Sequence, residues 1–458
     1  MHGRRMILLA MVCSVAVATI YVAQPLLAQI GRDLGVPESD LGWIVAAGQI
    51  GYLVGLAFLV PLGDMLDRRK LIGGQLLLAA VGMLVAAVAP GLWLLLIGLA
   101  VTGLFAVVVQ TTVVFAADLS TPTERGRTLG IVTSGVIIGI LGARTLAGIL
   151  ADLWGWRSVY VALMLLLVVL SIVVLKQLPA DHRSNRRTYG DVLTWLGRLF
   201  REPLFISRGL IAFFLFASFG TLWSGLALPL AAEPWQLSTA QIGMFGIAGL
   251  AGALGAARAG RWADTGRANP VTGTALALLA LSWVASGQAT WSLWLVIVGV
   301  IVLDFAVQGA HVSNQALLTA AYSDQTSSAI GGYMIFYSLG SALGATATTT
   351  IYSISGWAGS AVLGASFALC GLLTWTLGRR TVTRTRRDAA GHRSVRAARR
   401  RRKVEDDSSE RAAVDRGPTT IDRAMHPLTR GYRREPRRGM FTSVLGEGRR
   451  TAGSGRWF

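Results

Sequence analysis

The sequence predicts an all-α membrane protein of twelve transmembrane helices, and three observations support this class. Hydrophobic residues make up 53% of the 458-residue chain and charged residues only 15%, whereas a soluble domain carries about 25% charged residues. Apolar runs long enough to cross about 30 Å of hydrocarbon recur between Met6 and Leu377. The short polar segments between them alternate between rich and poor in Lys and Arg. A soluble globular fold is therefore excluded.

The apolar runs divide six and six around the longest polar interruption. They predict helices over residues 6–30, 42–62, 71–89, 92–117, 128–151, 157–178, 208–231, 241–259, 270–288, 291–318, 328–352 and 357–378. The predicted domains are an N-terminal six-helix bundle over residues 1–178, a cytoplasmic linker over 179–207, a C-terminal six-helix bundle over 208–378 and a basic tail over 379–458.

Most of the net charge of +19 lies in the tail. From Arg379 onward, 23 basic residues face 9 acidic ones, and the segment lacks apolar periodicity. It is therefore predicted to be disordered. The run Arg399 to Lys403 is typical of segments that bind nucleic acid or anionic lipid, but a solvated segment beside the membrane is the preferred interpretation. No nucleic-acid partner is expected. Cys13 and Cys370 lie in apolar runs and are given no metal or disulfide role.

The basic residues of the short loops predict the orientation, because they are retained on the cytoplasmic side. With the N-terminus inside, 17 basic residues, Arg208 among them, fall in cytoplasmic segments, and only Arg32 and Arg157 fall outside. Both termini are therefore predicted to be cytoplasmic, in the inner membrane of a bacterium.

The two halves repeat a pattern. In the first, AQPLLA around Pro25 is followed by a helix and then Gly63-x-x-x-Asp67; in the second, LALPLA around Pro229 is followed by a helix and then Gly260-x-x-x-Asp264. Duplicated bundles of this kind build a site near the middle of the membrane.

The loop PLGDMLDRRK resembles the loop signature of the major facilitator superfamily, with Lys70 where the family has a further glycine. The resemblance covers Met6 to about Leu377 and implies two pseudo-symmetric six-helix bundles. It also implies that a set of loop residues takes part in gating. Helix capping is an alternative role for the same residues and carries equal weight. The expected gating residues are Gly63, Asp64, Asp67, Arg68, Gly260 and Asp264.

The fifth predicted helix keeps the glycine spacing of the family's drug:proton antiporters, although residues 143 and 144 read Ala-Arg and the fourth helix has Leu99 where those proteins have arginine. Arg144 is costly inside a bilayer and is expected to face protein or a cavity. The alternative is that it reaches toward the outer membrane surface. The glycines permit close helix packing.

The tenth predicted helix carries the densest polar stripe. Asp304, Gln308, His311 and Gln315 are spaced four, three and four residues apart and share one face, with Asn314 beside them. In the family, the first, fourth, seventh and tenth helices line the central pathway. The resemblance therefore implies a substrate cavity formed by Gln24, Gln110, Gln308, Asn314 and Gln315.

Asp304 is the candidate for proton coupling, because a carboxyl in a poorly hydrated cavity can take up and release a proton near neutral pH. His311 is the alternative proton carrier or a substrate contact, and Arg144 is the expected partner. The competing interpretation is that Asp304 is a permanent structural partner of Arg144 or a helix-packing residue.

These features predict a secondary active transporter working by alternating access, most simply a proton-coupled exporter of a drug-like compound or metabolite. The alternatives are a proton-coupled nutrient importer of the same fold and a membrane receptor that no longer transports. The sequence lacks a phosphate-binding GxxxxGK[ST] motif and a recognised catalytic constellation, so no enzyme activity, cofactor or metal is expected. The expected partners are a small-molecule substrate, protons and lipid, and family habit predicts a monomer.

Overall fold

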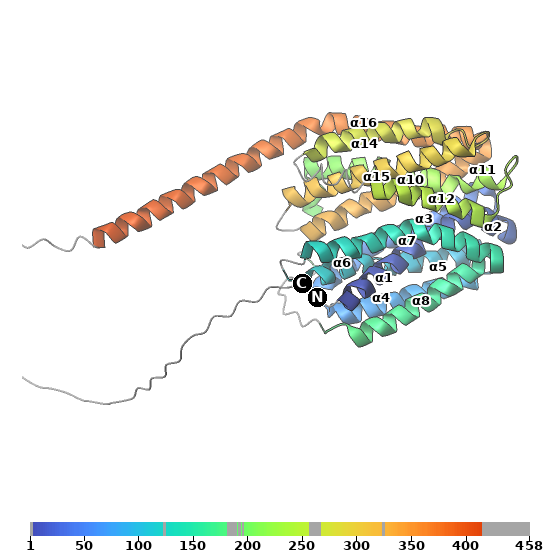
Figure 1. Cartoon of the computed structure of the whole chain (residues 1–458), viewed down its shortest axis with the longest axis horizontal. Coiled ribbons are helices and arrows are strands. Elements are labelled where there is room, and N and C mark those ends of the chain that lie inside the picture. The colour runs from blue at the N-terminus through green and yellow to red at the C-terminus, as the bar shows by residue number, and fades with distance from the viewer. Residues whose placement is uncertain are drawn as a thin grey trace, which may run out of the picture. The chain divides into compact units, whose positions relative to one another are not determined.

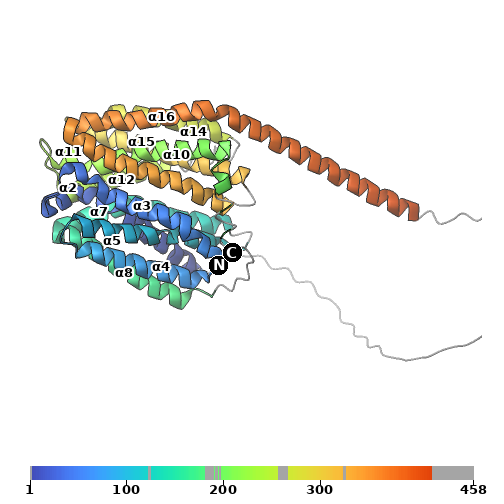
Figure 2. The same cartoon turned by 180° about the vertical axis from the view of Figure 1, so that it is seen from behind.

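The computed structural model describes residues 3–121, 125–180, 190, 194, 197–255, 267–322 and 326–414, and every regular element in these ranges is helical. This confirms the predicted all-α membrane fold. Compact unit 1 comprises residues 1–391 and unit 2 residues 392–458. The helices of the first half lie together, coloured blue to teal, as do those of the second half, coloured green to orange (Figures 1 and 2).

The described residues of the first half form eight α-helices and two short 3-10 helices. They are α1 (Gly3–Tyr21), α2 (Ala23–Leu34), η1 (Glu38–Asp40), α3 (Gly42–Phe58), η2 (Val60–Asp64), α4 (Arg68–Ala87), α5 (Leu92–Ala106), α6 (Val108–Asp118), α7 (Arg125–Trp154) and α8 (Trp156–Gln177).

The described elements of the second half follow a similar order. They are α10 (Pro203–Gly225), α11 (Ala227–Ala231), α12 (Thr239–Gly255), α14 (Ala268–Ser286), α15 (Leu293–Ala321) and α16 (Thr326–Val414), the last interrupted by the non-helical residue Gly356.

The predicted number of spans can be recovered from these helices. Among the described residues, ten segments are long and apolar enough to cross a membrane. One of them, Ser328–Gly378, is 51 residues long and breaks at Gly356 into two spans. A shorter apolar helix, Thr239–Leu254, supplies the remaining span. The predicted twelve spans therefore correspond to twelve helical passages.

Two prolines explain why the first helix of each half is broken. A proline inside a helix lacks an N–H donor and clashes with the carbonyl four residues earlier. Accordingly, α1 ends at Tyr21, four residues before Pro25, and α10 ends at Gly225, four residues before Pro229. The repeated sequence pattern thus produces a repeated bend.

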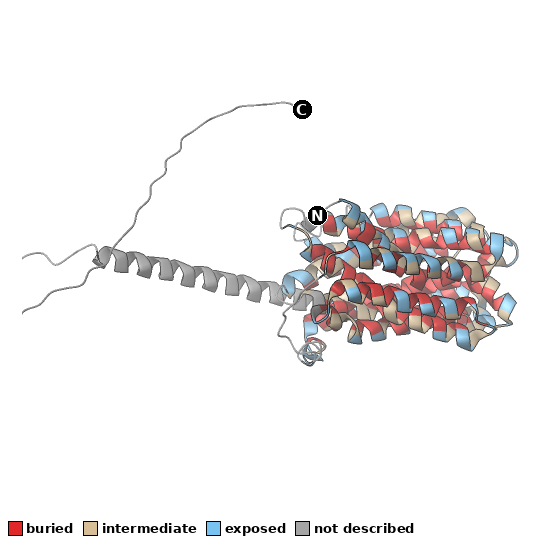
Figure 3. Ribbon diagram, turned by 90° about the horizontal axis from the view of Figure 1, so that it is seen from below, coloured by how far each residue is buried: buried red, intermediate tan, exposed pale blue. Residues whose placement is uncertain are grey.

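The outer faces of the bundle are apolar, as lipid requires. Large hydrophobic side chains such as Leu146 and Val284 are more than 60% exposed, and the buried residues face the interior between helices (Figure 3). Exposed tryptophans lie at the loops of one end, a position typical of a membrane interface. These residues are Trp43, Trp93, Trp154, Trp291 and Trp294. We call this end of the bundle the tryptophan end.

The start of the tail differs from the prediction. Composition predicted disorder from residue 379, but α16 continues to Val414. The sequence from 388 to 414 contains no proline and a single glycine, Gly391, and is rich in Ala and Arg, which are good helix formers. The tail beyond Val414 and, in the predicted linker, residues 181–189, 191–193 and 195–196 lie outside the described residues.

Candidate functional site between the two halves

Arg144 lies deep inside the protein and does not extend to the membrane surface. It is on α7, and only 1% of it is exposed. Its Nε and Nη2 atoms both donate to Oε1 of Gln24 on α2, at 2.9 and 2.7 Å, whereas its buried Nη1 has no hydrogen-bond partner in the described structure. The guanidinium is therefore held by a neutral side chain of its own half.

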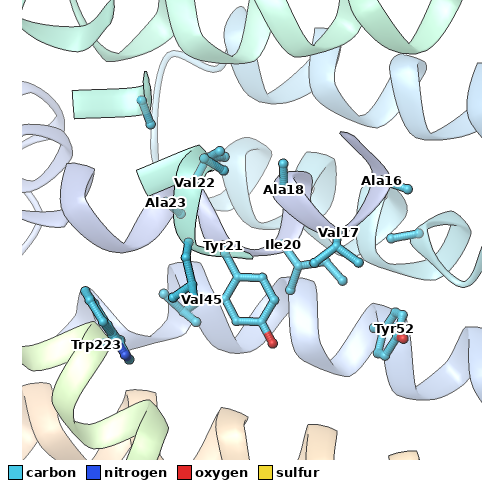
Figure 4. Close-up of a cluster of buried hydrophobic side chains, with 14 of the residues drawn as sticks. Ala16, Val17, Ala18, Ile20, Tyr21, Val22, Ala23, Val45, Tyr52 and Trp223 are labelled. Atoms are coloured by element: carbon cyan, nitrogen blue, oxygen red, sulfur yellow. The ribbon is translucent and has the colours of Figure 1, made fainter. Parts of the chain in front are cut away.

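Aromatic rings surround this guanidinium. Its Cζ atom lies 3.7 Å from the centre of the Trp223 ring, 5.4 Å from that of Tyr21 and 5.5 Å from that of Phe219. Figure 4 shows Tyr21, at the junction of α1 and α2, and Trp223 in this buried region. Because Trp223 and Phe219 belong to α10, the cation–π contacts join Arg144 to the other half.

Asp304 brings the opposite charge to the same region. It is on α15, is 1% exposed, and neither carboxylate oxygen has a hydrogen-bond partner among the described residues. Asp304 and Arg144 both lie beside the Trp223 ring, and the Trp223 indole N–H makes no hydrogen bond in the described structure. No ion pair joins Asp304 to Arg144 in the described chain.

Space for the Asp304 carboxyl is provided by Gly249 on α12. A Cβ atom added at Gly249 would lie 2.9 Å from Asp304 Oδ2 and 2.9 Å from Cζ2 of Trp223. We call Arg144, Asp304, Gln24, Trp223 and Gly249 the central charged cluster. It contains two opposite charges from different halves that are close enough to interact and are not paired.

The rest of the α15 stripe lies in a separate network. The Nδ1 atom of His311 is 3.1 Å from the hydroxyl of Tyr333, and the Nε2 atom of Gln315 is 3.2 Å from Nε2 of His311. Asn314 Oδ1 accepts from Nη1 of Arg208 at 3.4 Å. Ten residues separate Asp304 from Asn314, which is about 15 Å along a helix. Thus the predicted stripe divides into two regions.

Arg208 corrects the sequence analysis, which counted it among the loop charges. It lies on α10, its exposed fraction is 0%, and its Nη2 donates to Oδ1 of Asn269 at 3.1 Å. The predicted helix began at residue 208, but α10 begins five residues earlier at Pro203, and this places the arginine inside the membrane bundle. Proline at the first helical position was the available signal.

The glutamines that were predicted to line one cavity also lie in different surroundings. Gln24 binds Arg144, whereas Gln110 Nε2 donates to the hydroxyl of Tyr52 at 2.8 Å. Gln308 is half-buried on α15. Gln49 was missed by the sequence analysis; it is fully buried on α3, and neither side-chain polar atom makes a hydrogen bond in the described structure.

The loop signature forms a compact ionic junction. Asp67 caps α4 by accepting from the Arg69 N–H at 3.0 Å, as the sequence analysis expected. Arg68 is 1% exposed, donates to the Gly63 carbonyl at 2.8 Å and pairs with Asp118 at 2.6 Å. Asp118 is the last residue of α6, so this pair joins the end of α6 to the start of α4.

Three of the predicted gating residues fall wholly or partly outside the described part of the chain. Gly260 and Asp264 lie outside the described residues. Asp64 ends η2, and its side chain also lies outside the described part.

Hydrogen bonds join the halves at the tryptophan end. Thr349 Oγ1 on α16 accepts from the Gly42 N–H at 3.1 Å, and the Asp152 carboxylate accepts from the Ala240 N–H at 3.0 Å. Nearer the centre, Thr145 Oγ1 on α7 donates to the Gly243 carbonyl on α12 at 2.9 Å. These contacts hold the tryptophan end closed.

Comparison with known proteins gives matches along most of the chain. The profile described as Major Facilitator Superfamily matches residues 7–226 and 208–405. The uncharacterized transporter YgaY of Escherichia coli O157:H7 is 41% identical over 373 residues, which cover 81% of this chain and 95% of that protein. The multidrug resistance protein Stp of Mycobacterium tuberculosis strain H37Rv is 33% identical over 138 residues, covering 29% of this chain and 25% of Stp.

A solved structure shares the fold. It is a bacterial homologue of the human lysosomal transporter Spinster, in an inward-facing and occupied conformation. The TM-score is 0.71 at 15% sequence identity, and the alignment covers 84% of this chain and 98% of the other.

Proposed function

Because this chain belongs to the major facilitator superfamily and is a multi-pass membrane transporter, we propose that it couples protons to the export of a small organic molecule. The single observation that carries the proposal is the central charged cluster. Arg144 and Asp304 are both fully buried, come from different halves and are not joined by an ion pair. Intramembrane ionisable residues of this kind typically mark ion or substrate pathways.

Protonation of Asp304 would change how strongly the halves attract each other. An ionised Asp304 attracts the Arg144 guanidinium across the interface between the halves, whereas a protonated one does not. The attraction acts in a region of low dielectric, so one proton can shift the balance between two arrangements of the halves. Competition between proton and substrate for this cluster would then give exchange.

The described state fits one step of such a cycle. The positive-inside rule assigns the Arg68 end of the bundle to the cytoplasm and the tryptophan end to the outside. Because the bonds between the halves gather at the tryptophan end, we assign the structure to an inward-facing state. We also propose that the membrane is the bacterial cytoplasmic membrane, with both termini inside.

The preference for export rests on two further features. The glycine spacing of the fifth span resembles that of drug:proton antiporters, and the matched protein Stp is named for multidrug resistance. Import of a nutrient with a proton would use the same cluster, so direction requires its own measurement.

The test is proton release from purified protein in weakly buffered detergent between pH 6 and pH 9, on addition of a panel of amphiphilic compounds. Wild type is compared with Asp304→Asn. The matched control is Asp118→Asn, which removes a carboxylate outside the cluster. We expect a compound that releases protons from wild type and from Asp118→Asn but not from Asp304→Asn.

Binding with no proton release, or equal release from all three proteins, would rule out coupling at Asp304. A compound found in this way is then loaded into proteoliposomes under an imposed pH gradient. Movement against the proton flux identifies an exporter, and movement with it identifies an importer. Binding without counterflow would favour a receptor.

A further inference from the structure

Arg208 is a second buried arginine that the proposed coupling mechanism does not use. It lies five residues into α10, at the end of the bundle opposite the tryptophans, and its exposed fraction is 0%. Burying a guanidinium away from water is expensive unless a negative group or a full set of acceptors compensates it. The contacts of Arg208 therefore indicate what the site lacks.

The partners of Arg208 in the described chain are neutral. Nη1 donates to Asn314 Oδ1 at a long 3.4 Å, and Nη2 donates to Asn269 Oδ1 at 3.1 Å. The Asn269 oxygen is shared, because it also accepts from the Trp375 indole N–H at 3.1 Å. The Nε atom of Arg208 is buried with no hydrogen-bond partner. The guanidinium thus receives less compensation than its burial requires.

A further donor lies beside it without an acceptor. Because Asn314 Oδ1 faces the guanidinium, its Nδ2 is the free donor, and that atom is buried with no partner in the described structure. A guanidinium and an amide are thus short of acceptors, and an oxyanion supplies several acceptors together with a negative charge.

The same network continues to two partly buried polar residues of α15. His311 and Gln315 are partly exposed on α15, and His311 is linked to the buried Tyr333. The His311 ring also packs edge-on against Phe216, with ring centres 5.2 Å apart. An anion at Arg208 would therefore have polar and aromatic groups available for the rest of its molecule.

We propose that Arg208 and Asn314 form a binding subsite for a carboxylate or phosphate group. The group belongs either to the transported molecule, which makes the cargo an amphiphilic organic anion, or to the headgroup of an anionic lipid. The cargo interpretation rests on the proposed transport function; the oxyanion site itself does not.

The test measures thermal unfolding of the purified protein in uncharged detergent. The soluble probes are benzoate and inorganic phosphate, each compared with chloride at equal ionic strength, and the lipid probe is phosphatidylglycerol compared with phosphatidylcholine. The variants are Arg208→Gln and, in case that protein does not fold, Asn314→Leu. Arg157→Gln is the matched control, because Arg157 is a partly exposed guanidinium at the tryptophan end.

We expect benzoate or phosphate to raise the unfolding temperature of wild type and Arg157→Gln. The concentration needed should rise about tenfold or more in Arg208→Gln and Asn314→Leu, the effect of losing hydrogen bonds to a charged group. If only phosphatidylglycerol stabilises the protein, and the same variants lose this effect, the oxyanion site stands but its ligand is a lipid headgroup. That result would overturn the assignment of the site to cargo. The site would be overturned if no probe raised the unfolding temperature more than its control did, or if the unfolding temperature shifted equally in all variants.

The two proposals fail separately. If Asp304→Asn leaves proton release unchanged while the Arg208-dependent shift remains, coupling at Asp304 is wrong and the oxyanion site stands. If proton release depends on Asp304 but no anion stabilises the protein, the transport proposal stands without this subsite.

Discussion

Two arginine and aspartate pairs of this protein are built in opposite ways. Arg68 and Asp118 belong to the same half and form an ion pair at 2.6 Å, with the Asp118 side chain 41% exposed. Arg144 and Asp304 belong to different halves, are each 1% exposed and form no ion pair within the described chain. A closed pair within one half is suited to holding helices together, whereas an open pair between halves is suited to switching.

The largest effect is expected at the open pair. Arg144→Gln removes the charge that responds to Asp304, and proton-driven transport should fall by roughly 100-fold, near the upper limit of coupling between two sites. The measurement is substrate flux in proteoliposomes per folded protein. The double variant Arg144→Gln with Asp304→Asn should be more stable than Arg144→Gln alone, because no charge is then left buried without a partner. Undiminished proton-driven flux would show that the open pair is not the switch.

The second-largest effect is expected when the space beside the Asp304 carboxyl is filled. Gly249→Ala places a Cβ atom 2.9 Å from the Asp304 carboxyl, and crowding of this kind costs about 1–3 kcal/mol. Transport should fall several-fold and the apparent affinity for protons should change. Gly74→Ala on α4 is the control, because no atom lies within 4 Å of the added Cβ there. Equal behaviour of the two variants would mean that the carboxyl moves aside freely.

The closed pair should affect stability more than transport. Arg68→Ala removes a charged hydrogen bond to the Gly63 carbonyl and the partner of Asp118, so we expect a loss of about 1.5–3 kcal/mol in the free energy of unfolding. Thermal unfolding in detergent measures the loss, and flux per folded molecule should remain near that of wild type. A large loss of flux with normal stability would assign this junction to gating.

The smallest effect is expected at the contact between α7 and α12. Thr145→Val removes the hydrogen bond to the Gly243 carbonyl, worth about 1 kcal/mol, and should open the tryptophan end in a larger fraction of molecules. Spin labels at Leu153 and Ala232, introduced after replacing the exposed Cys370, report this distance distribution. An unchanged distribution would mean that this bond does not bias the two states.

Several features were predictable because local physics controls them. Apolar run length fixes the spans, since each must cross the hydrocarbon with its backbone paired internally. Pro25 and Pro229 fix the two bends, and Asp67 fixes the start of α4. The cost of a buried guanidinium was enough to expect Arg144 in the interior, where it lies.

Other features depended on neighbours that are distant in sequence. The helical spacing placed Asp304, His311 and Asn314 near one face, and the helix rise keeps Asp304 about 15 Å from Asn314. Only the tertiary structure decided that Gly249 lies against Asp304, that Tyr333 contacts His311 and that Arg208 donates to Asn314. The position of Arg208 also depended on where α10 begins, a boundary that hydropathy does not fix.

The sequence by itself thus determined the membrane class, the number of spans and the polar inventory of the interior, because these follow from hydropathy and single-residue costs. Only the tertiary structure decided that Gln24 binds Arg144, that Gly249 makes room for Asp304 and that Arg68 pairs with Asp118. Each of those contacts joins residues at least 50 positions apart, and their geometry is set by how whole helices pack.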